Sequence, residues 1–414
     1  MGKVLLVVLD GLGDRPVNGK TPLSEAEKPN LNRLAKTGIN GIMDTISPGI
    51  RPGSDTGHLS LLGYDPYKYY TGRGPIEAAG TGVEVKPGDV AFRVNFGTVE
   101  GEGESVFDKV VVDRRAGRIS DTDELEKAIN EGVDLSEFNV EFIFRRGSGH
   151  RGALVLRGEG LSDRIGDTDP HKVGEKVRRC VPLDDSEEAK RTAEIVNSFM
   201  EQAHRILEKH PLNEERAKKG LPKANAVLLR GAGKCPHIPS FEEMHGMKLA
   251  VIAGTTLIKG IGKLLKGYVP DVEGATGNRN TNLENKVKAT LKALEDYDFV
   301  LLHIKATDEL SHDGDFEGKK EFIERVDKAI KPLLDLDFGE VCLIVTADHS
   351  TPVTVREHTG DPVPVVIVHE GVRVDDVDEF SELKAWKGGL CRIRGMDLFR
   401  IALDLIDRME KFGA

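Results

Sequence analysis

The sequence predicts an α/β protein with a doubly wound, mostly parallel sheet that carries an inserted α+β domain. Short apolar runs alternate with amphipathic segments at both ends of the chain, which is the pattern of strands and helices in such sheets. The middle of the chain shows period-two alternation and hairpin signals instead. At 414 residues the chain also exceeds the usual size of a single hydrophobic core.

The outer segments supply the predicted parallel sheet. Continuous apolar runs predict buried strands at residues 4–9, 39–46, 249–253, 299–304, 341–346 and 363–368, and we expect the last of these to be the final strand. Amphipathic segments predict helices at residues 29–36, 257–265, 283–294, 322–334 and 396–409. These elements assign residues 1–75 and 246–414 to one domain.

Residues 76–245 form the predicted insertion. Residues 89–113 alternate in period two around a glycine-rich turn at 101–103, and the runs 140–144 and 153–156 read as a strand pair. A long amphipathic helix is expected over 187–208 and a further strand over 226–230.

Composition narrows the class of protein. A net charge of −11 argues against a nucleic-acid or anionic-membrane surface. No run approaches the ~20 apolar residues of a membrane span, and the four cysteines form no CxxC pair. We therefore expect a cytoplasmic, reduced protein.

Ser54 opens an apolar run after Gly53, so it is expected at a helix N-terminus. Backbone N–H groups and the helix dipole favour negative charge there, which suits a phosphate or a serine alkoxide. The alternative is that Ser54 is only an N-cap.

Carboxylates and imidazoles follow three of the predicted strands. Asp10 ends the first, Asp308 and His312 stand four apart after another, and Asp348-His349 follow a third, with His358 on the next loop. Two divalent ions roughly 4 Å apart could share these donors with Ser54. Each residue alone could instead be an ordinary hydrogen-bonded turn residue. The chain has no Walker loop and no dinucleotide-binding GxGxxG, which argues against a kinase or a dehydrogenase.

Together these motifs resemble the alkaline phosphatase superfamily, and its fold is implied for the outer domain. The closest resemblance is to the archaeal-type 2,3-bisphosphoglycerate-independent phosphoglycerate mutases. It covers essentially the whole chain, including the insertion and Arg-Gly-Pro-Ile-Glu-Ala at 73–78. His358 follows His349 by only nine residues, a shorter spacing than in the bacterial form.

The resemblance implies interconversion of 3- and 2-phosphoglycerate in glycolysis and gluconeogenesis, through a phosphoserine at Ser54 and without 2,3-bisphosphoglycerate. It implies one divalent ion held by Asp10, Ser54, Asp348 and His349, and a second held by Asp308, His312 and His358. Mn²⁺ is expected, with Zn²⁺, Co²⁺ or Mg²⁺ also compatible with oxygen and nitrogen donors. The insertion would close over the substrate, with binding groups from His150, Arg151, Arg230 and Lys259.

Three other interpretations stay open. A metal-dependent phosphomonoesterase would use the same serine but pass the phosphate to water, and another phosphosugar mutase would differ only in substrate. A non-catalytic metal- or phosphate-binding protein would not depend on Ser54. For Arg151 and Arg230 the alternative is a solvated surface charge, and a homo-oligomer is neither required nor excluded.

Overall fold

The computed structural model describes residues 2–413, which form two compact units. Unit 1 comprises the chain up to Tyr69 and from Pro239 onward, and unit 2 comprises Tyr70–Ile238. The sequence places these boundaries a few residues later, at 76 and 245.

Unit 1 contains a seven-stranded sheet in the order β12-β2-β11-β10-β1-β9-β8. Its strands are β1 (Lys3–Leu9), β2 (Ile39–Asp44), β8 (Leu249–Ile252), β9 (Phe299–Ile304), β10 (Val341–Thr346), β11 (Val363–Val368) and β12 (Cys391–Arg394). Strands β8, β9, β1 and β10 run parallel, as do β12 and β2, whereas β11 is antiparallel to both its neighbours. The predicted mostly parallel sheet is confirmed.

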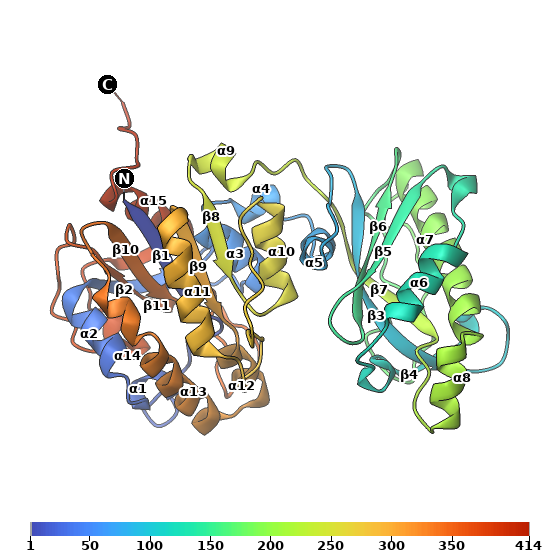
Figure 1. Cartoon of the computed structure of the whole chain (residues 1–414), viewed down its shortest axis with the longest axis horizontal. Coiled ribbons are helices and arrows are strands. Elements are labelled where there is room, and N and C mark those ends of the chain that lie inside the picture. Colours follow the sequence, from blue (N-terminus) through green and yellow to red (C-terminus); the bar gives the residue numbers. More distant parts are fainter. Residues whose placement is uncertain (1, 414) are drawn as a thin grey trace. The chain divides into compact units, whose positions relative to one another are not determined.

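Helices cover both faces of this sheet. They are α1 (Pro22–Glu25), α2 (Pro29–Thr37), α3 (Ser54–Leu61), α4 (Pro66–Tyr69), α9 (Phe241–His245), α10 (Thr256–Leu264), α11 (Leu283–Asp296), α12 (Ala306–Asp313), α13 (Phe316–Ala329), α14 (Glu382–Ala385) and α15 (Gly395–Leu405). Helix α13 contacts α2 and α11, while α3 contacts α10 and α15. Figure 1 shows α11 in front of the strands and α3 behind them. The strands between are almost wholly buried, which explains their continuous apolar runs.

Two predicted elements of unit 1 are wrong in detail. The run 363–368 is not the last strand, because β12 follows it; β12 is a short edge strand with two arginines and has no apolar run. The helix predicted over 322–334 begins earlier, at Phe316, where the Asp315 side chain accepts the Gly318 N–H. It ends at Ala329, and a 3₁₀ turn containing Pro332 completes the segment.

Unit 2 is an antiparallel sheet with helices on both faces. Its strands are β3 (Val90–Glu100), β4 (Val110–Asp113), β5 (Glu141–Arg146), β6 (Arg151–Arg157) and β7 (Ala226–Lys234). Its helices are α5 (Gly74–Gly80), α6 (Asp123–Gly132), α7 (Glu187–Glu208) and α8 (Pro211–Lys218). Along β3, Phe92, Val94 and Phe96 join the core beneath α7, whereas Ala91 packs with residues of α5 on the other face. None of the helices within residues 2–413 is long and apolar enough to cross a membrane.

The central strands of unit 1 should dominate its stability. Leu301 of β9 is fully buried, so Leu301→Ala should lower the free energy of unfolding by about 2–5 kcal/mol. Val374→Ala is the matched control, because Val374 is 56% exposed and its truncation should change the unfolding free energy by less than about 0.5 kcal/mol. Denaturant unfolding followed by circular dichroism and by Trp386, the single tryptophan, measures both. Equal losses in the two variants would contradict this assignment of the core.

Candidate active site

The carboxyl ends of three neighbouring parallel strands form the candidate active site of unit 1. Asp10 follows β1, Lys305 follows β9, and Asp348 and His349 follow β10. Strands β9, β1 and β10 are adjacent and parallel, so these side chains emerge at one edge of the sheet. Helix α12 then carries Asp308 and His312 from the same edge, and His358 lies on the loop that leads to β11.

Ser54 points into this edge. It is the first residue of α3, and Gly53 occupies the N-cap position, so the interpretation of Ser54 as an N-cap is wrong. Its Oγ lies 3.2 Å from His349 Nε2 and 3.5 Å from Asp10 Oδ1. Helix α3 comes this close because Gly57 has no side chain: a Cβ there would stand 2.9 Å from the main-chain oxygen of Asp348.

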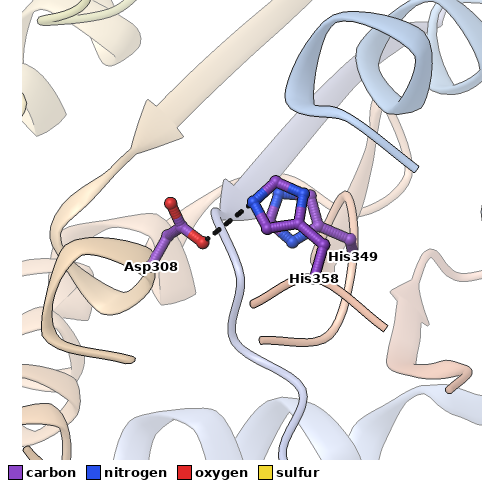
Figure 2. A group of neighbouring side chains, drawn as sticks. All are labelled: Asp308, His349 and His358. Atoms are coloured by element: carbon purple, nitrogen blue, oxygen red, sulfur yellow. Dashed lines mark ion pairs between the residues drawn. The ribbon is translucent and has the colours of Figure 1, made fainter. Parts of the chain in front are cut away.

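A second group surrounds Asp308. The Nε2 atoms of His312 and His358 lie 3.4 and 3.5 Å from its carboxylate oxygens. Figure 2 shows the rings of His349 and His358 lying one over the other with Asp308 turned toward them. Their ring centroids are 3.6 Å apart, so His349 adjoins both groups. Glu357, which the sequence interpretation omitted, forms a further set of close donor atoms with His312 and His358.

His312, His349 and His358 all turn Nε2 toward the carboxylates of the site, because the Nδ1 atom of each ring is hydrogen-bonded to another group. The Nδ1 partners are the main-chain oxygen of Arg356 for His312, that of Pro52 for His358, and Thr351 Oγ1 for His349. This second hydrogen bond is what fixes the tautomer and orientation of metal-ligating imidazoles. The donor set therefore fits one or more divalent cations.

The charge balance at the site also favours cations. Asp10, Asp308 and Asp348 are all buried, and one ammonium, that of Lys305, contacts two of them at 2.8 and 2.6 Å. Burial opposes ionisation of Asp10, yet Lys305, His303 and His349 hold its pKa well below the usual range. Within the described residues no hydrogen bond reaches the buried Asp348 Oδ2, although His349 Nε2 lies 3.2 Å away. Buried carboxylates are costly unless cations or donors compensate them, so a divalent ion suits this site.

Lys305 and His303 belong to the site but were missed from the sequence. Besides the two carboxylates, Lys305 Nζ lies 3.5 Å from Ser54 Oγ. His303 Nε2 donates to Asp10 Oδ2 over 2.7 Å, which leaves Oδ1 facing Ser54. The sequence did carry a signal for both residues. His303 is a polar residue within an otherwise apolar strand, and Lys305 is a charged residue directly after that strand.

Unit 2 contains a cationic cluster, formed around Arg93, Arg151 and Arg230, on the α5 face of its sheet. Arg93 of β3 stands directly across from Arg230 of β7, and Asn95 across from Arg151 of β6. Like charges directly opposite each other on neighbouring strands destabilise a sheet. The Nε atoms of Arg93 and Arg230 are buried and, within residues 2–413, make no hydrogen bond. This arrangement suits the binding of an anion.

Two carboxylates partly neutralise the cluster. Glu77 accepts from Arg73 at 2.8 Å and lies 3.7 Å from Arg93 Nε. Asp169 forms a two-pronged pair with Arg114 and lies 4.0 Å from Arg230 Nε. Burial, opposed by Glu77 and assisted by the neighbouring guanidinium groups, lowers the pKa of Arg93 to about 9. Such a guanidinium gains by contact with an added anion.

The four predicted substrate-binding residues are divided between the units. His150, Arg151 and Arg230 lie in or beside the cationic cluster, whose neighbouring charges act on one another. The Nε of Arg230 is buried, so this residue is not a simple surface charge, whereas Arg151 is exposed. Lys259 is on α10 of unit 1, where its Nζ pairs with Asp271 at 2.9 Å.

Comparison with known proteins identifies the family. The family model described as 2,3-bisphosphoglycerate-independent phosphoglycerate mutase matches residues 35–213. A protein of that name from Archaeoglobus fulgidus is 70% identical over 411 residues, covering 99% of this chain and all of the relative. The chain belongs to this family.

Other relatives and solved structures are similar to this chain over all or nearly all of its length. A phosphoglycerate mutase of the same name from Methanosphaera stadtmanae is 52% identical over 418 residues, with full coverage of both chains. The cofactor-independent phosphoglycerate mutase of Thermoplasma acidophilum has a similar structure, with a TM-score of 0.73, 42% identity and coverage of 98% of this chain and 100% of that one. A protein of Pyrococcus horikoshii gives a TM-score of 0.84 at 41% identity, covering 100% and 99%.

The pKa of His150 reports on the cationic cluster. Burial, together with the positive charges of Arg151, Arg115 and Arg93, lowers it to about 4. A bound anion would stabilise the imidazolium form, so phosphate or 3-phosphoglycerate should raise this pKa, which NMR titration measures. Arg93→Met should raise it in the free protein by removing a positive charge. His210, the N-cap residue of α8, is the control, and its resonance should not shift with the anion. A His150 that titrates near 6.5 and ignores the anion would contradict an anion site.

Proposed function

We propose that the protein interconverts 3-phosphoglycerate and 2-phosphoglycerate by transferring the phosphoryl group to Ser54 and back. Family membership supports this reaction, and the observation that carries its mechanism is the serine oxygen facing buried carboxylates, imidazoles and Lys305 at one sheet edge. No 2,3-bisphosphoglycerate is needed, because the serine itself would carry the phosphate between the two positions.

Two divalent ions, with Mn²⁺ the first candidate, would be held by this edge. Asp10, Ser54, Asp348 and His349 would hold one, and Asp308, His312 and His358 the other. When bound, such ions lower the pKa of a coordinated hydroxyl and neutralise phosphoryl oxygens. His303 would keep Asp10 oriented, and the Lys305 ammonium would contact a phosphoryl group on Ser54, from whose Oγ it lies 3.5 Å.

The transfer balances without another reactant. Ser54 Oγ loses its proton and bonds to phosphorus, the bond from phosphorus to the 3-oxygen breaks, and that oxygen gains a proton to give glycerate. The 2-hydroxyl of glycerate then loses its proton and bonds to phosphorus, the bond from phosphorus to Ser54 Oγ breaks, and Oγ regains a proton. The product is 2-phosphoglycerate. Glycerate must stay bound between the two steps. The cationic cluster of unit 2 offers the bidentate donors that suit a carboxylate, and we assign to it the role of holding glycerate.

The rival function within the same chemistry is hydrolysis of a phosphomonoester, in which water attacks the phosphoserine. The cationic cluster favours the mutase. A hydrolase releases its alcohol and has no need to hold it, whereas Arg93 and Arg230 stand opposite each other, an arrangement that a bound anion would stabilise.

The test is incubation of Mn²⁺-loaded protein with 3-phosphoglycerate, following 2-phosphoglycerate and free phosphate in the same reaction. We expect 2-phosphoglycerate with little phosphate. Ser54→Ala should reduce turnover by roughly four orders of magnitude or more, since nothing else on the chain would carry the phosphoryl group. Ser60→Ala is the matched control, because Ser60 is buried on the same helix and donates only to Thr45 O at 2.6 Å. Free phosphate without 2-phosphoglycerate would favour the hydrolase function instead. An active Ser54→Ala protein would exclude the phosphoserine route.

The cationic cluster is tested separately. Arg93→Met should weaken substrate binding by about 1.5–3 kcal/mol, the range for hydrogen bonds to charged groups, which is roughly ten- to a hundredfold in KM. Arg145→Met is the control: Arg145 also lies on a strand of unit 2, but it is half-exposed and pairs with Glu126. If both variants retained the wild-type KM, the substrate carboxylate would have to bind elsewhere.

A further inference from the structure

Lys319 of α13 is fully buried and lies directly behind the candidate active site. Its Nζ donates to three acceptors from two separate loops: Asp14 Oδ2 at 2.9 Å, the main-chain oxygen of Gly11 at 3.0 Å and that of Thr351 at 3.3 Å. Gly11 and Asp14 belong to the loop after β1, and Thr351 to the loop after β10. One ammonium group therefore joins both loops to α13.

Each of these loops carries groups assigned above as metal ligands. Gly11 follows Asp10 directly, and its N–H donates to Asp348 Oδ1 at 3.1 Å. Thr351 lies two residues after His349. Its hydroxyl is 2.9 Å from His349 Nδ1 and donates to Asp308 Oδ1 at 2.8 Å. A displacement of Thr351 would thus change the orientation of ligands in both groups.

Asp14 completes the connection. Its carboxylate accepts the main-chain N–H of Val353 at 3.2 and 3.3 Å, and its own N–H donates to Glu382 Oε1 at 3.0 Å. Glu382 also accepts from Thr21 Oγ1 at 2.7 Å. The ion pair of Asp14 and Lys319 is therefore hydrogen-bonded to main-chain groups of both loops and, through the Asp14 N–H, to Glu382.

We propose that Lys319 is a positioning residue that sets the relative placement of the two ligand-bearing loops, and so the geometry of the metal centre. This inference rests on the proposed function, which assigns the ligands. A buried ion pair usually adds little net stability over an apolar pair of similar size. A charged group that donates to three acceptors in fixed directions, however, fixes loops as an apolar side chain cannot.

The test compares Lys319→Met with Lys28→Met, using Co²⁺ as a visible probe of coordination. Lys28 is also a buried lysine of unit 1, but its Nζ makes longer contacts, at 3.5 Å to Ala26 O and to Glu379. In Lys319→Met we expect Co²⁺ affinity, measured by calorimetry, to fall about tenfold or more, together with a changed visible absorption spectrum. Lys28→Met should keep the wild-type spectrum and affinity even if its melting temperature falls.

The outcomes separate the inference from the proposed function. Wild-type protein that binds no Co²⁺ or Mn²⁺ would overturn the assigned metal centre itself. Normal wild-type binding with an unchanged Lys319→Met spectrum, or equal changes in both lysine variants, would overturn the role of Lys319 alone. Should Lys319→Met not fold, Asp14→Asn weakens the same contact while keeping the side-chain volume. Its Co²⁺ spectrum should shift in the same direction, and a wild-type spectrum there would count against the proposal.

Discussion

The structure of unit 1 depends on the burial of three carboxylates at one edge of its sheet. Asp10, Asp308 and Asp348 are held in the interior, where uncompensated negative charge is strongly unfavourable. Most of the surrounding polar structure serves to compensate it: Lys305 and His303 contact Asp10, Thr351 and two imidazoles contact Asp308, and the Gly11 N–H contacts Asp348. The burial of Lys319 nearby follows from the same requirement, because the loops that carry the acids need a fixed support.

Unit 2 instead brings positive charges together, on one face of strand β3. Successive side chains of β3 point to opposite faces, so the strand buries Phe92 and Val94 in the core while Arg93 lies on the other side. Pairing β3 with β7 then brings Arg93 opposite Arg230. Sheet stability alone would not favour two facing guanidinium groups. An anionic ligand would offset this repulsion, which agrees with the proposed function.

The parts of the site that sequence could predict are those fixed by local order along the chain. Asp10, Asp348 and His349 end apolar runs, and parallel strands necessarily collect such residues at one edge, so an edge rich in carboxylates and imidazoles was predictable. The i, i+4 spacing of Asp308 and His312 was equally local. The Nδ1 contacts of the histidines were not, because the partner oxygens of Pro52 and Arg356 lie far away along the chain. Similarly, β12 could not be found, since an exposed edge strand needs no apolar run.

Arg93 shows the limit most clearly, since its environment depends on strand register. The alternation around it identified a strand face, but a charged residue on that face is ordinarily solvated. Only the pairing of β3 with both β6 and β7 makes β3 an interior strand and places its Arg93 among other guanidinium groups. Register is a non-local property, fixed by which residues the two faces must bury. Lys259 illustrates the converse: its role was implied by resemblance alone, and in unit 1 its ammonium pairs with Asp271.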